Sequence, residues 1–182
     1  MEIKKSATAR VFFALWPTVE LQQRLHGVAE AGQRQCAGRV MRADSLHMTL
    51  LFLGEMDRAR LPQLVLAAEG LRAPAFAFEL ARLAYWRHNR IGYAAPVGEV
   101  ATLLDLVTEL QDRVAAAGFP FDRRTFTPHV TLLRNVARTS IAGTFAPMQW
   151  AVDTFTLVET VATAEGLRYQ VLHRWSLPAV AV

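Results

Sequence analysis

Residues 47–51 read HMTLL, and residues 129–133, 82 positions later, read HVTLL. An arginine stands five residues before each copy, Arg42 and Arg124, and a helical pattern precedes each copy. Because residues i and i+2 of a strand point to the same face, each copy places a histidine beside a threonine. The repetition predicts a duplicated strand–helix–strand unit, and therefore two similar lobes.

The rest of the chain alternates between strand and helix patterns, with no linker rich in serine or glycine. Apolar runs predict strands over residues 10–16, 46–53, 75–86, 90–95, 129–133, 150–160 and 169–177. Helical spacing predicts helices over residues 17–38, from 57 to about 71, and over 98–118. We expect Gly54 to end the second strand and Asp57 to cap the following helix. At 182 residues and 52% hydrophobic content, we expect one domain over residues 1–182.

Composition excludes several classes of protein. Cys36 is the single cysteine, so this chain alone can form neither a disulfide nor a cysteine-rich metal site. No apolar stretch approaches the roughly 20 residues that span a bilayer, and no signal-peptide cleavage region follows the charged start. We therefore expect a cytoplasmic protein. The net charge is +4, and all but two of the 20 basic residues are arginine, which weakly favours a polyanionic partner.

The two histidine–threonine pairs form the candidate site. A lone histidine in an apolar strand is usually a core residue, but two identical pairs would converge on one cleft if the lobes pack around an approximate two-fold axis. One imidazole could then take a proton from water while the other gives a proton to the leaving sugar oxygen of a phosphodiester. The threonine hydroxyls could donate hydrogen bonds to the non-bridging phosphate oxygens.

Other chemistries fit the sequence less well. Two histidines could ligate zinc, but neither repeat contains Asp, Glu or Cys, and a catalytic zinc usually takes three protein ligands. We therefore expect no metal and no cofactor. The chain has neither a Walker loop nor a GxSxG elbow, which argues against Walker-type triphosphatases and common serine hydrolases. His26 in a helix, His88 in a hairpin turn and His173 in a C-terminal strand are expected to play no part in catalysis.

Three segments extend the pattern beyond the motifs: VFFAL at 11–15, LHMTLLFLG at 46–54 and RTFTPHVTLLR at 124–134. They resemble the bacterial and archaeal RNA 2′,3′-cyclic phosphodiesterases, earlier named 2′-5′ RNA ligases, of the two-histidine phosphoesterase superfamily. The resemblance covers nearly the whole chain. It implies an α+β fold with two pseudo-symmetric lobes, each an antiparallel sheet backed by helices, and an active-site cleft between them.

The same resemblance implies an activity and roles for the motif residues. The protein would open a 2′,3′-cyclic phosphate at an RNA end to a 2′-phosphomonoester, without a metal. His47 would be the proton donor to the leaving 3′ oxygen and His129 the proton acceptor that activates water, although the sequence alone does not rank them. Thr49 and Thr131 would bind the phosphate. Arg134 matches the family's phosphate-binding position, but strict alternation turns it away from Thr131 unless the strand ends or bulges.

Further substrate contacts and alternatives remain open at this point. Arg124, Phe126 and either Phe12 or Phe13 could line the cleft, where an aromatic ring can stack on a base. The alternatives are hydrolysis of another cyclic nucleotide or of a 2′-5′ linkage, and a non-catalytic nucleotide-binding module. The expected partners are RNA ends or small cyclic nucleotides. We expect a monomer with no membrane association and no obligate protein partner.

Overall fold

The computed structural model describes residues 6–137, 141–164 and 166–179. In chain order the elements are β1 (Thr8–Leu15), α1 (Val19–Cys36), β2 (Arg39–Val40), η1 (Ala43–Ser45), β3 (Met48–Asp57), η2 (Arg58–Arg60), α2 (Leu61–Ala68), β4 (Phe76–Trp86), β5 (Ile91–Val97), α3 (Ala101–Ala116), β6 (Val130–Arg134), β7 (Gly143–Val152), β8 (Thr154–Thr163) and β9 (Gly166–Ser176).

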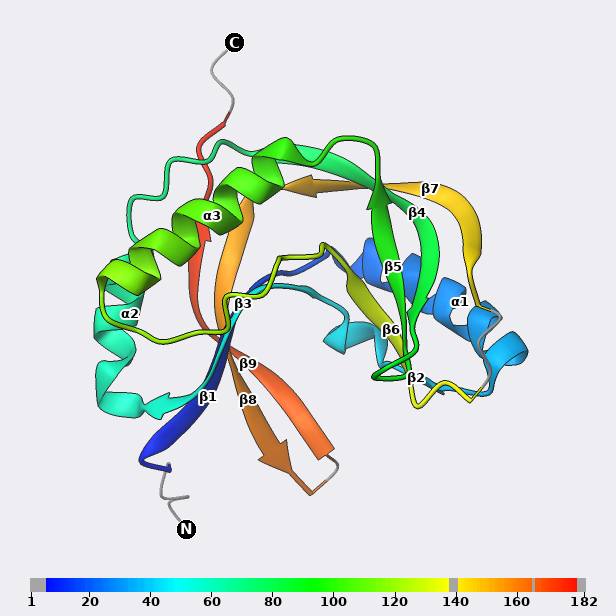
Figure 1. The fold of residues 1–182 in the computed structure, drawn as a ribbon, viewed down its shortest axis with the longest axis horizontal. Coiled ribbons are helices and arrows are strands. Elements are labelled where there is room, and N and C mark those ends of the chain that lie inside the picture. The colour runs from blue at the N-terminus through cyan, green and yellow to red at the C-terminus, as the bar shows by residue number, and fades with distance from the viewer. Residues whose placement is uncertain (1–5, 138–140, 165, 180–182) are drawn as a thin grey trace.

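The strands form two sheets, which lie in the two halves of the molecule (Figure 1). The four-stranded sheet has the order β3-β1-β8-β9, and the five-stranded sheet has the order β2-β6-β5-β4-β7. All of these strand pairs are antiparallel. The predicted α+β fold, with two antiparallel sheets backed by helices, is confirmed.

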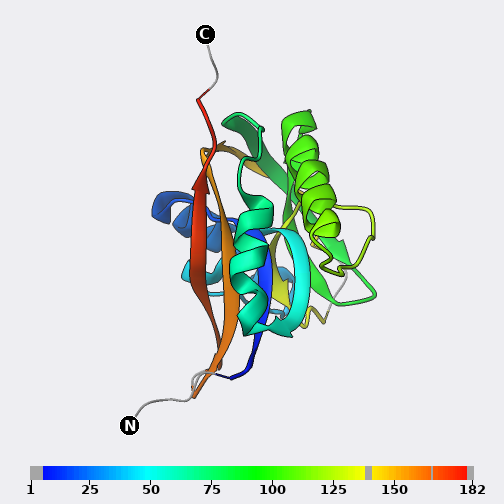
Figure 2. The ribbon, with the colours of Figure 1, turned by 90° about the vertical axis from the view of Figure 1, so that its left-hand side faces the viewer.

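The helices are exchanged between the two sheets. Helix α1 follows β1 of the four-stranded sheet, yet it packs against β2 and β6 of the five-stranded sheet. Helix α3 follows β5 of the five-stranded sheet, yet it packs against β3, with α2 beside it. Figure 2 shows α2 and α3 on one side of the sheet that contains β8 and β9. Buried side chains from both sheets form one continuous core cluster, so the two halves share an interior.

The two motif strands carry the same irregularity. The extra residue in the pairing of β3 with β1 is Leu50, and the extra residue in the pairing of β6 with β5 is Leu132, at the matching place of the repeat. Residues 48–52 and 130–134 also share one burial order: buried, half-buried, buried, buried, exposed. A bulge of this kind interrupts the in–out alternation of a strand. The repeat therefore extends from the sequence to the backbone.

Several predicted boundaries are wrong. Gly54 does not end its strand: β3 runs on to Asp57, and Gly54, with φ of 78°, lies at a second bulge that glycine accommodates without strain. Asp57 caps the short turn η2, accepting from the Ala59 N–H at 2.9 Å, and α2 starts only at Leu61. The strand predicted over 150–160 is two strands, β7 and β8, which meet at Asp153 and belong to different sheets.

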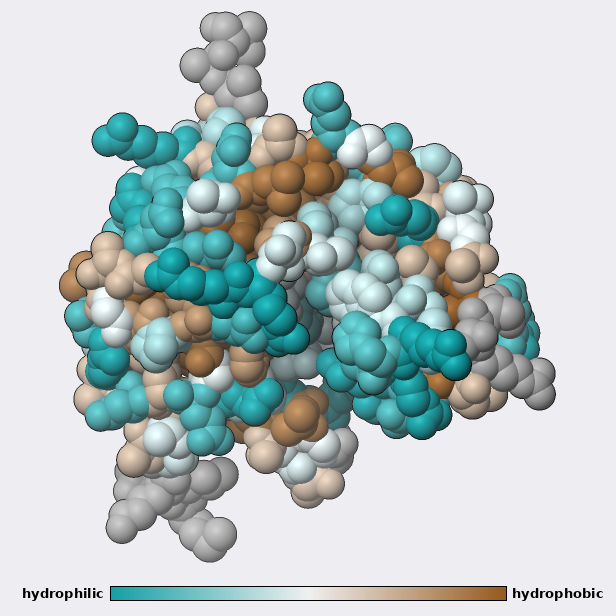
Figure 3. Space-filling model, in the orientation of Figure 1, coloured by the Kyte–Doolittle hydropathy of each residue, from teal (hydrophilic) through white to brown (hydrophobic). Residues whose placement is uncertain are grey.

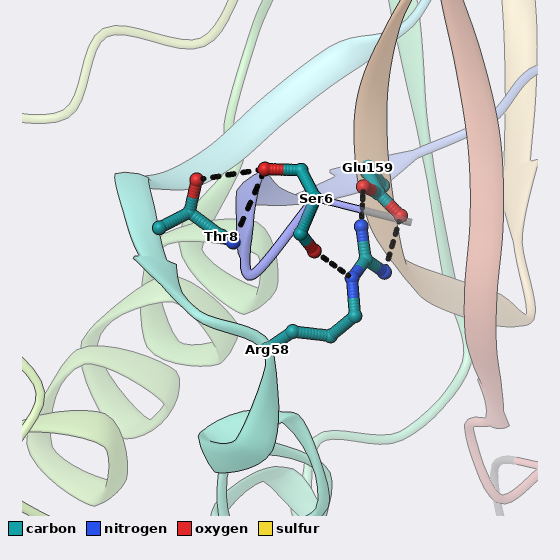
Figure 4. Close-up of polar contacts among 4 residues, drawn as sticks. All are labelled: Ser6, Thr8, Arg58 and Glu159. Carbon is teal, nitrogen blue, oxygen red and sulfur yellow. Dashed lines mark hydrogen bonds and ion pairs between the residues drawn. The ribbon is translucent and has the colours of Figure 1, made fainter. Parts of the chain in front are cut away.

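A partly buried ion pair joins the turn after β3 to the middle of β8 (Figure 4). Arg58 Nη1 donates to Glu159 Oε2 at 3.0 Å, and Nη2 donates to the other carboxylate oxygen. Arg58 Nε also donates to the carbonyl oxygen of Ser6, just before β1, at 3.1 Å. Glu159 is only 7% exposed, and Arg58 reaches both of its carboxylate oxygens. The pair holds together the three strands β1, β3 and β8.

Candidate active site

Each motif histidine is held by the same hydrogen bond. Nδ1 of His47 lies 2.8 Å from the carbonyl oxygen of Ser45, and Nδ1 of His129 lies 2.8 Å from the carbonyl oxygen of Thr127. A carbonyl oxygen only accepts, so Nδ1 is the donor and carries the hydrogen in both rings. Nε2 is therefore the nitrogen left in each ring to take up or release a proton.

His47 lies in an aromatic box formed by Phe12, Trp16 and Tyr169. Its ring stacks on Phe12 and on Trp16, with 5.0 Å between ring centroids in both cases. Tyr169 of β9 meets the imidazole edge-on at 4.9 Å and is also edge-on to the other two rings. The box covers the imidazole with apolar surface and restricts access of water to it.

The sequence predicted part of this box. Of the two phenylalanines considered, the structure places Phe12 against His47 and Phe13 in the main core, where it contacts Phe155 and Trp175. Trp16 was not predicted. The sequence nevertheless contains a signal for Trp16. It is four residues after Phe12 in the same strand-like run, and strand alternation puts residues at even spacing on one face.

His129 has fewer aromatic neighbours. Trp86, at the end of β4, meets its ring edge-on with centroids 4.5 Å apart, and Tyr93 of β5 does so at 5.7 Å. The sequence predicted the hairpin that carries these two residues. It did not indicate that this hairpin pairs with β6, so neither residue was predicted as part of the site.

The two histidines and Arg134 act on one another electrostatically. Burial, the largest cause, together with the charges of His129 and Arg134 lowers the pKa of His47 to about 4, against the upward effect of its bond to Ser45. Burial likewise lowers the pKa of His129, opposed by the Thr127 bond and assisted by Arg134. A single arginine thus disfavours protonation of both imidazoles. With no anion bound, both rings are mainly neutral at pH 7.

The two motif threonines lie on the faces that carry the histidine contacts. Thr49 pairs with Ala14, which clusters with Phe12 of the aromatic box, and Thr131 pairs with Tyr93 beside His129. Directly opposite residues in antiparallel strands share a face. Both threonines are half-buried. Figure 3 shows the surface hollowed between the two halves of the molecule.

The bulge at Leu132 explains the position of Arg134. Leu132 and Leu133 are consecutive buried residues, so the alternation shifts by one and Arg134 returns to the face of Thr131. A bulge of this kind is what the expected phosphate-binding position of Arg134 needs. The matching position in β3 is Phe52, an exposed ring with the Arg10 guanidinium 4.9 Å from its centroid.

The other two predicted contacts, Arg124 and Phe126, have different surroundings. The Arg124 side chain is 86% exposed and forms an ion pair with Asp122 at 2.7 Å. Phe126 is half-buried and packs against the main core. Roles for both in substrate binding stay predictions.

The three remaining histidines lie outside the two motif strands. His26 Nδ1 is 3.8 Å from Glu30, and His173 Nε2 is 3.9 Å from Glu69. His88 lies in the exposed turn between β4 and β5. Across the residues described, no group of three or more His, Cys, Asp or Glu side chains could hold a metal ion. In the same part of the chain, no helix has the length and apolar character needed to cross a membrane.

Two antiparallel sheets that each present an HxT motif define a class of protein, the two-histidine phosphoesterases. A family model described as LigT like Phosphoesterase matches residues 15–93. The Escherichia coli (strain K12) protein named RNA 2′,3′-cyclic phosphodiesterase is 31% identical over 176 residues, which cover 94% of this chain and 98% of that protein. A Thermotoga maritima protein of the same name is 25% identical over 175 residues, covering 90% of this chain and 93% of that protein.

A solved structure agrees with these relatives. The crystal structure of E. coli LigT complexed with 3′-AMP superposes with a TM-score of 0.83 at 31% identity, and covers 93% of this chain and 98% of that one. The chain belongs to the LigT-like phosphoesterase family. The family resemblance predicted from the sequence is confirmed.

Proposed function

We propose that this protein is an RNA 2′,3′-cyclic phosphodiesterase that hydrolyses a terminal 2′,3′-cyclic phosphate to a 2′-phosphomonoester. The observation that carries the proposal is the matched pair of Nδ1–carbonyl hydrogen bonds, which leaves Nε2 of His47 and of His129 for proton transfer. The names of the E. coli and Thermotoga maritima relatives support the substrate class.

In the proposed reaction, neutral His129 takes a proton from a water molecule at Nε2 as the water oxygen attacks phosphorus. The phosphorus–O3′ bond breaks, and protonated His47 gives its Nε2 proton to the departing 3′ oxygen. The products are a 2′-phosphate and a free 3′-hydroxyl. Thr49 and Thr131 donate hydrogen bonds to the non-bridging oxygens, and Arg134 stabilises the negative charge that builds on them.

The aromatic box makes protonated His47 a stronger acid in the proposed reaction. Because burial holds its pKa near 4, protonated His47 is a strong acid once formed. The anionic phosphodiester favours the protonated ring, since an opposite charge close by raises the pKa of an imidazole. Binding of the substrate would therefore favour protonation of His47, and His47 would later give this proton to the leaving 3′ oxygen.

The test is hydrolysis of an oligonucleotide that ends in a 2′,3′-cyclic phosphate, followed by ³¹P NMR to identify the product. We expect His47→Ala and His129→Ala to abolish turnover with the circular dichroism spectrum unchanged, while His88→Ala keeps the wild-type rate. Activity should persist in a chelator. Wild-type turnover in both active-site variants, or a 3′-phosphate product, would contradict the mechanism.

We further propose that the protein acts as a cytoplasmic monomer on RNA ends or small cyclic nucleotides, and that residues 1–182 fold as one domain. The core cluster common to both sheets and the exchanged helices support the single domain. Light scattering after size-exclusion chromatography measures the oligomeric state. Coincident unfolding transitions by fluorescence and circular dichroism are expected for one domain, whereas two separate transitions would contradict it.

A further inference from the structure

Two arginines lie directly opposite each other where the five-stranded sheet ends. Arg39, the first residue of β2, pairs with Arg134, the last residue of β6. The backbone around this pair is held in place, because the Met41 N–H donates to the carbonyl oxygen of Leu132 at 2.9 Å. Directly opposite residues of antiparallel strands point to the same face. The two guanidinium groups therefore extend from neighbouring strands on one side of the sheet.

That side carries the second motif. Helix α1 covers the other face of β2 and β6 (Figure 1), and a Cβ placed on Gly32 of this helix would lie 3.2 Å from Leu133 Cδ1. Leu133 immediately precedes Arg134, and neighbouring residues of a strand point to opposite faces, so Arg134 points away from α1. Because of the bulge in β6, Arg134 shares its face with Thr131. Arg39 therefore lies on the face of the candidate active site.

The two arginines are exposed, and the described part of the chain gives them no counter-charge. Neither guanidinium group forms a hydrogen bond or an ion pair with any residue that the structure describes. Like charges directly opposite each other destabilise a sheet. An anion between them would remove the repulsion and accept hydrogen bonds from both planar forks. By contrast, three other arginines of the chain each have a carboxylate partner: Arg58, Arg113 and Arg124.

The electrostatic effect of Arg134 indicates which anion this would be. Its charge lowers the pKa of both His47 and His129, so it acts on the two groups that would exchange protons with the substrate. Side chains directly opposite in a sheet start only about 5 Å apart. An arginine is long enough to span that spacing, so Arg39 can reach a phosphate that Arg134 holds.

The charge of the phosphate changes during the proposed reaction. A cyclic phosphodiester carries one negative charge. Attack by water, with loss of a proton to His129, adds a second negative charge to the phosphate oxygens. A phosphomonoester has a second pKa of about 6, so the product carries nearly two negative charges at pH 7. One guanidinium group matches the substrate, whereas two match the transition state and the product.

We propose that Arg39 is a second phosphate-binding residue, which forms with Arg134 a two-arginine clamp on the reacting phosphate. This rests on the proposed function and adds a residue to its site. Arg134 binds the single charge of the cyclic substrate. Arg39 binds the second charge, which appears as water attacks and which the 2′-phosphomonoester keeps. The clamp therefore binds the transition state and the product more tightly than the substrate.

The binding test uses two ligands that differ by one charge, adenosine 2′-phosphate and its methyl ester, measured by calorimetry near pH 7.5. Arg39→Gln should weaken binding of the monoester about tenfold, the effect of one charged hydrogen bond, and binding of the methyl ester less than about threefold. Arg39→Lys keeps the charge and should recover part of the loss. The matched control is Arg72→Gln, an exposed arginine between α2 and β4, which should change neither affinity. Equal losses for the two ligands would overturn the assignment of the second charge to Arg39.

A double-mutant cycle tests whether both arginines hold the same phosphate. The affinity for adenosine 2′-phosphate is measured in the wild type, Arg39→Gln, Arg134→Gln and the double variant. For two residues on one phosphate, the loss in the double variant should differ from the product of the single losses by about threefold or more. Losses that simply multiply would show independent action and would contradict the clamp.

Kinetics and stability distinguish phosphate binding from a structural role. In single turnovers of adenosine 2′,3′-cyclic phosphate, Arg39→Gln should lower the rate constant about tenfold and leave the half-saturating concentration nearly unchanged. Its urea midpoint in phosphate-free buffer should not fall, because the substitution removes a repulsion. A large fall in this midpoint, or an unchanged rate constant, would overturn the proposal.

The same measurements separate failure of the clamp from failure of the proposed function. Wild-type turnover and monoester affinity in Arg39→Gln would overturn the clamp and leave the phosphodiesterase activity standing. Monoester binding that depends on Arg39, with no turnover of any cyclic substrate by the wild type, would support the clamp and contradict the proposed function.

Discussion

The aromatic box around His47 should make the stability of the protein sensitive to mild acid. An imidazole has an ordinary pKa of about 6.5, whereas burial lowers the pKa of folded His47 to about 4. Between these values the unfolded chain binds the proton more readily than the folded one. Stability from this residue is therefore fully present above pH 6.5 and is lost as the pH falls toward 4.

The size of the effect follows from the two pKa values. Linkage gives a loss of about 2 kcal/mol between pH 7 and pH 5, and about 3 kcal/mol by pH 4. The change His47→Asn removes the titrating group, while its amide can still donate to the Ser45 carbonyl. The variant should therefore lose about 2 kcal/mol less stability than the wild type between pH 7 and pH 5.

The measurement is urea unfolding followed by circular dichroism at pH 7 and pH 5. Stopping at pH 5 keeps most carboxylates out of the comparison. Buffers free of phosphate and sulfate are needed, because an anion in the site would favour protonated His47. The matched control is His88→Asn in the exposed turn between β4 and β5, which should behave like the wild type. Equal losses of stability in the wild type and in His47→Asn would refute the reasoning.

Three further perturbations test the site and its support. Arg134→Gln should lower kcat/KM by about tenfold to a hundredfold and raise the pKa of both motif histidines, seen as a shift of the pH–rate profile to higher pH. Trp16→Leu should admit water to one face of His47 and raise its pKa toward 6.5, measured by NMR titration of the imidazole. Glu159→Gln should lower the free energy of unfolding by about 2 kcal/mol in a urea titration, because Arg58, 23% exposed, loses its charged partner; an unchanged midpoint would contradict this role.

The repeated HxT pattern predicted that a histidine and a threonine lie side by side in each half of the candidate site, because strand periodicity needs no tertiary information. His47 and Thr49 share a face by local geometry alone, and the second copy follows the same rule. The family resemblance then gave the fold class and the two-sheet arrangement. The same alternation places Phe12 of β1 and Trp16, which directly follows β1, on one face.

The remainder depends on contacts between distant segments. Trp86 and Tyr93 reach His129 only because β5 pairs with β6 in one register, and no local pattern encodes that register. The exchange of α1 and α3 between the sheets is similarly invisible, because an apolar helix face does not indicate which sheet it will cover. Asp153 separates β7 from β8, but the apolar pattern looks continuous across it, so periodicity alone predicted a single strand over residues 150–160.

The matched bulges also give the cleft a direction. A duplicated site with perfect two-fold symmetry would accept a phosphodiester in either of two opposite orientations. Here the equivalent positions after the bulges differ, with a cationic Arg134 in one half and the Phe52 ring in the other. One wall of the candidate cleft therefore carries a positive charge, while the other carries an exposed aromatic ring. The two halves therefore present different side chains at equivalent positions, so a phosphodiester in the candidate cleft would meet a different wall in each of its two orientations.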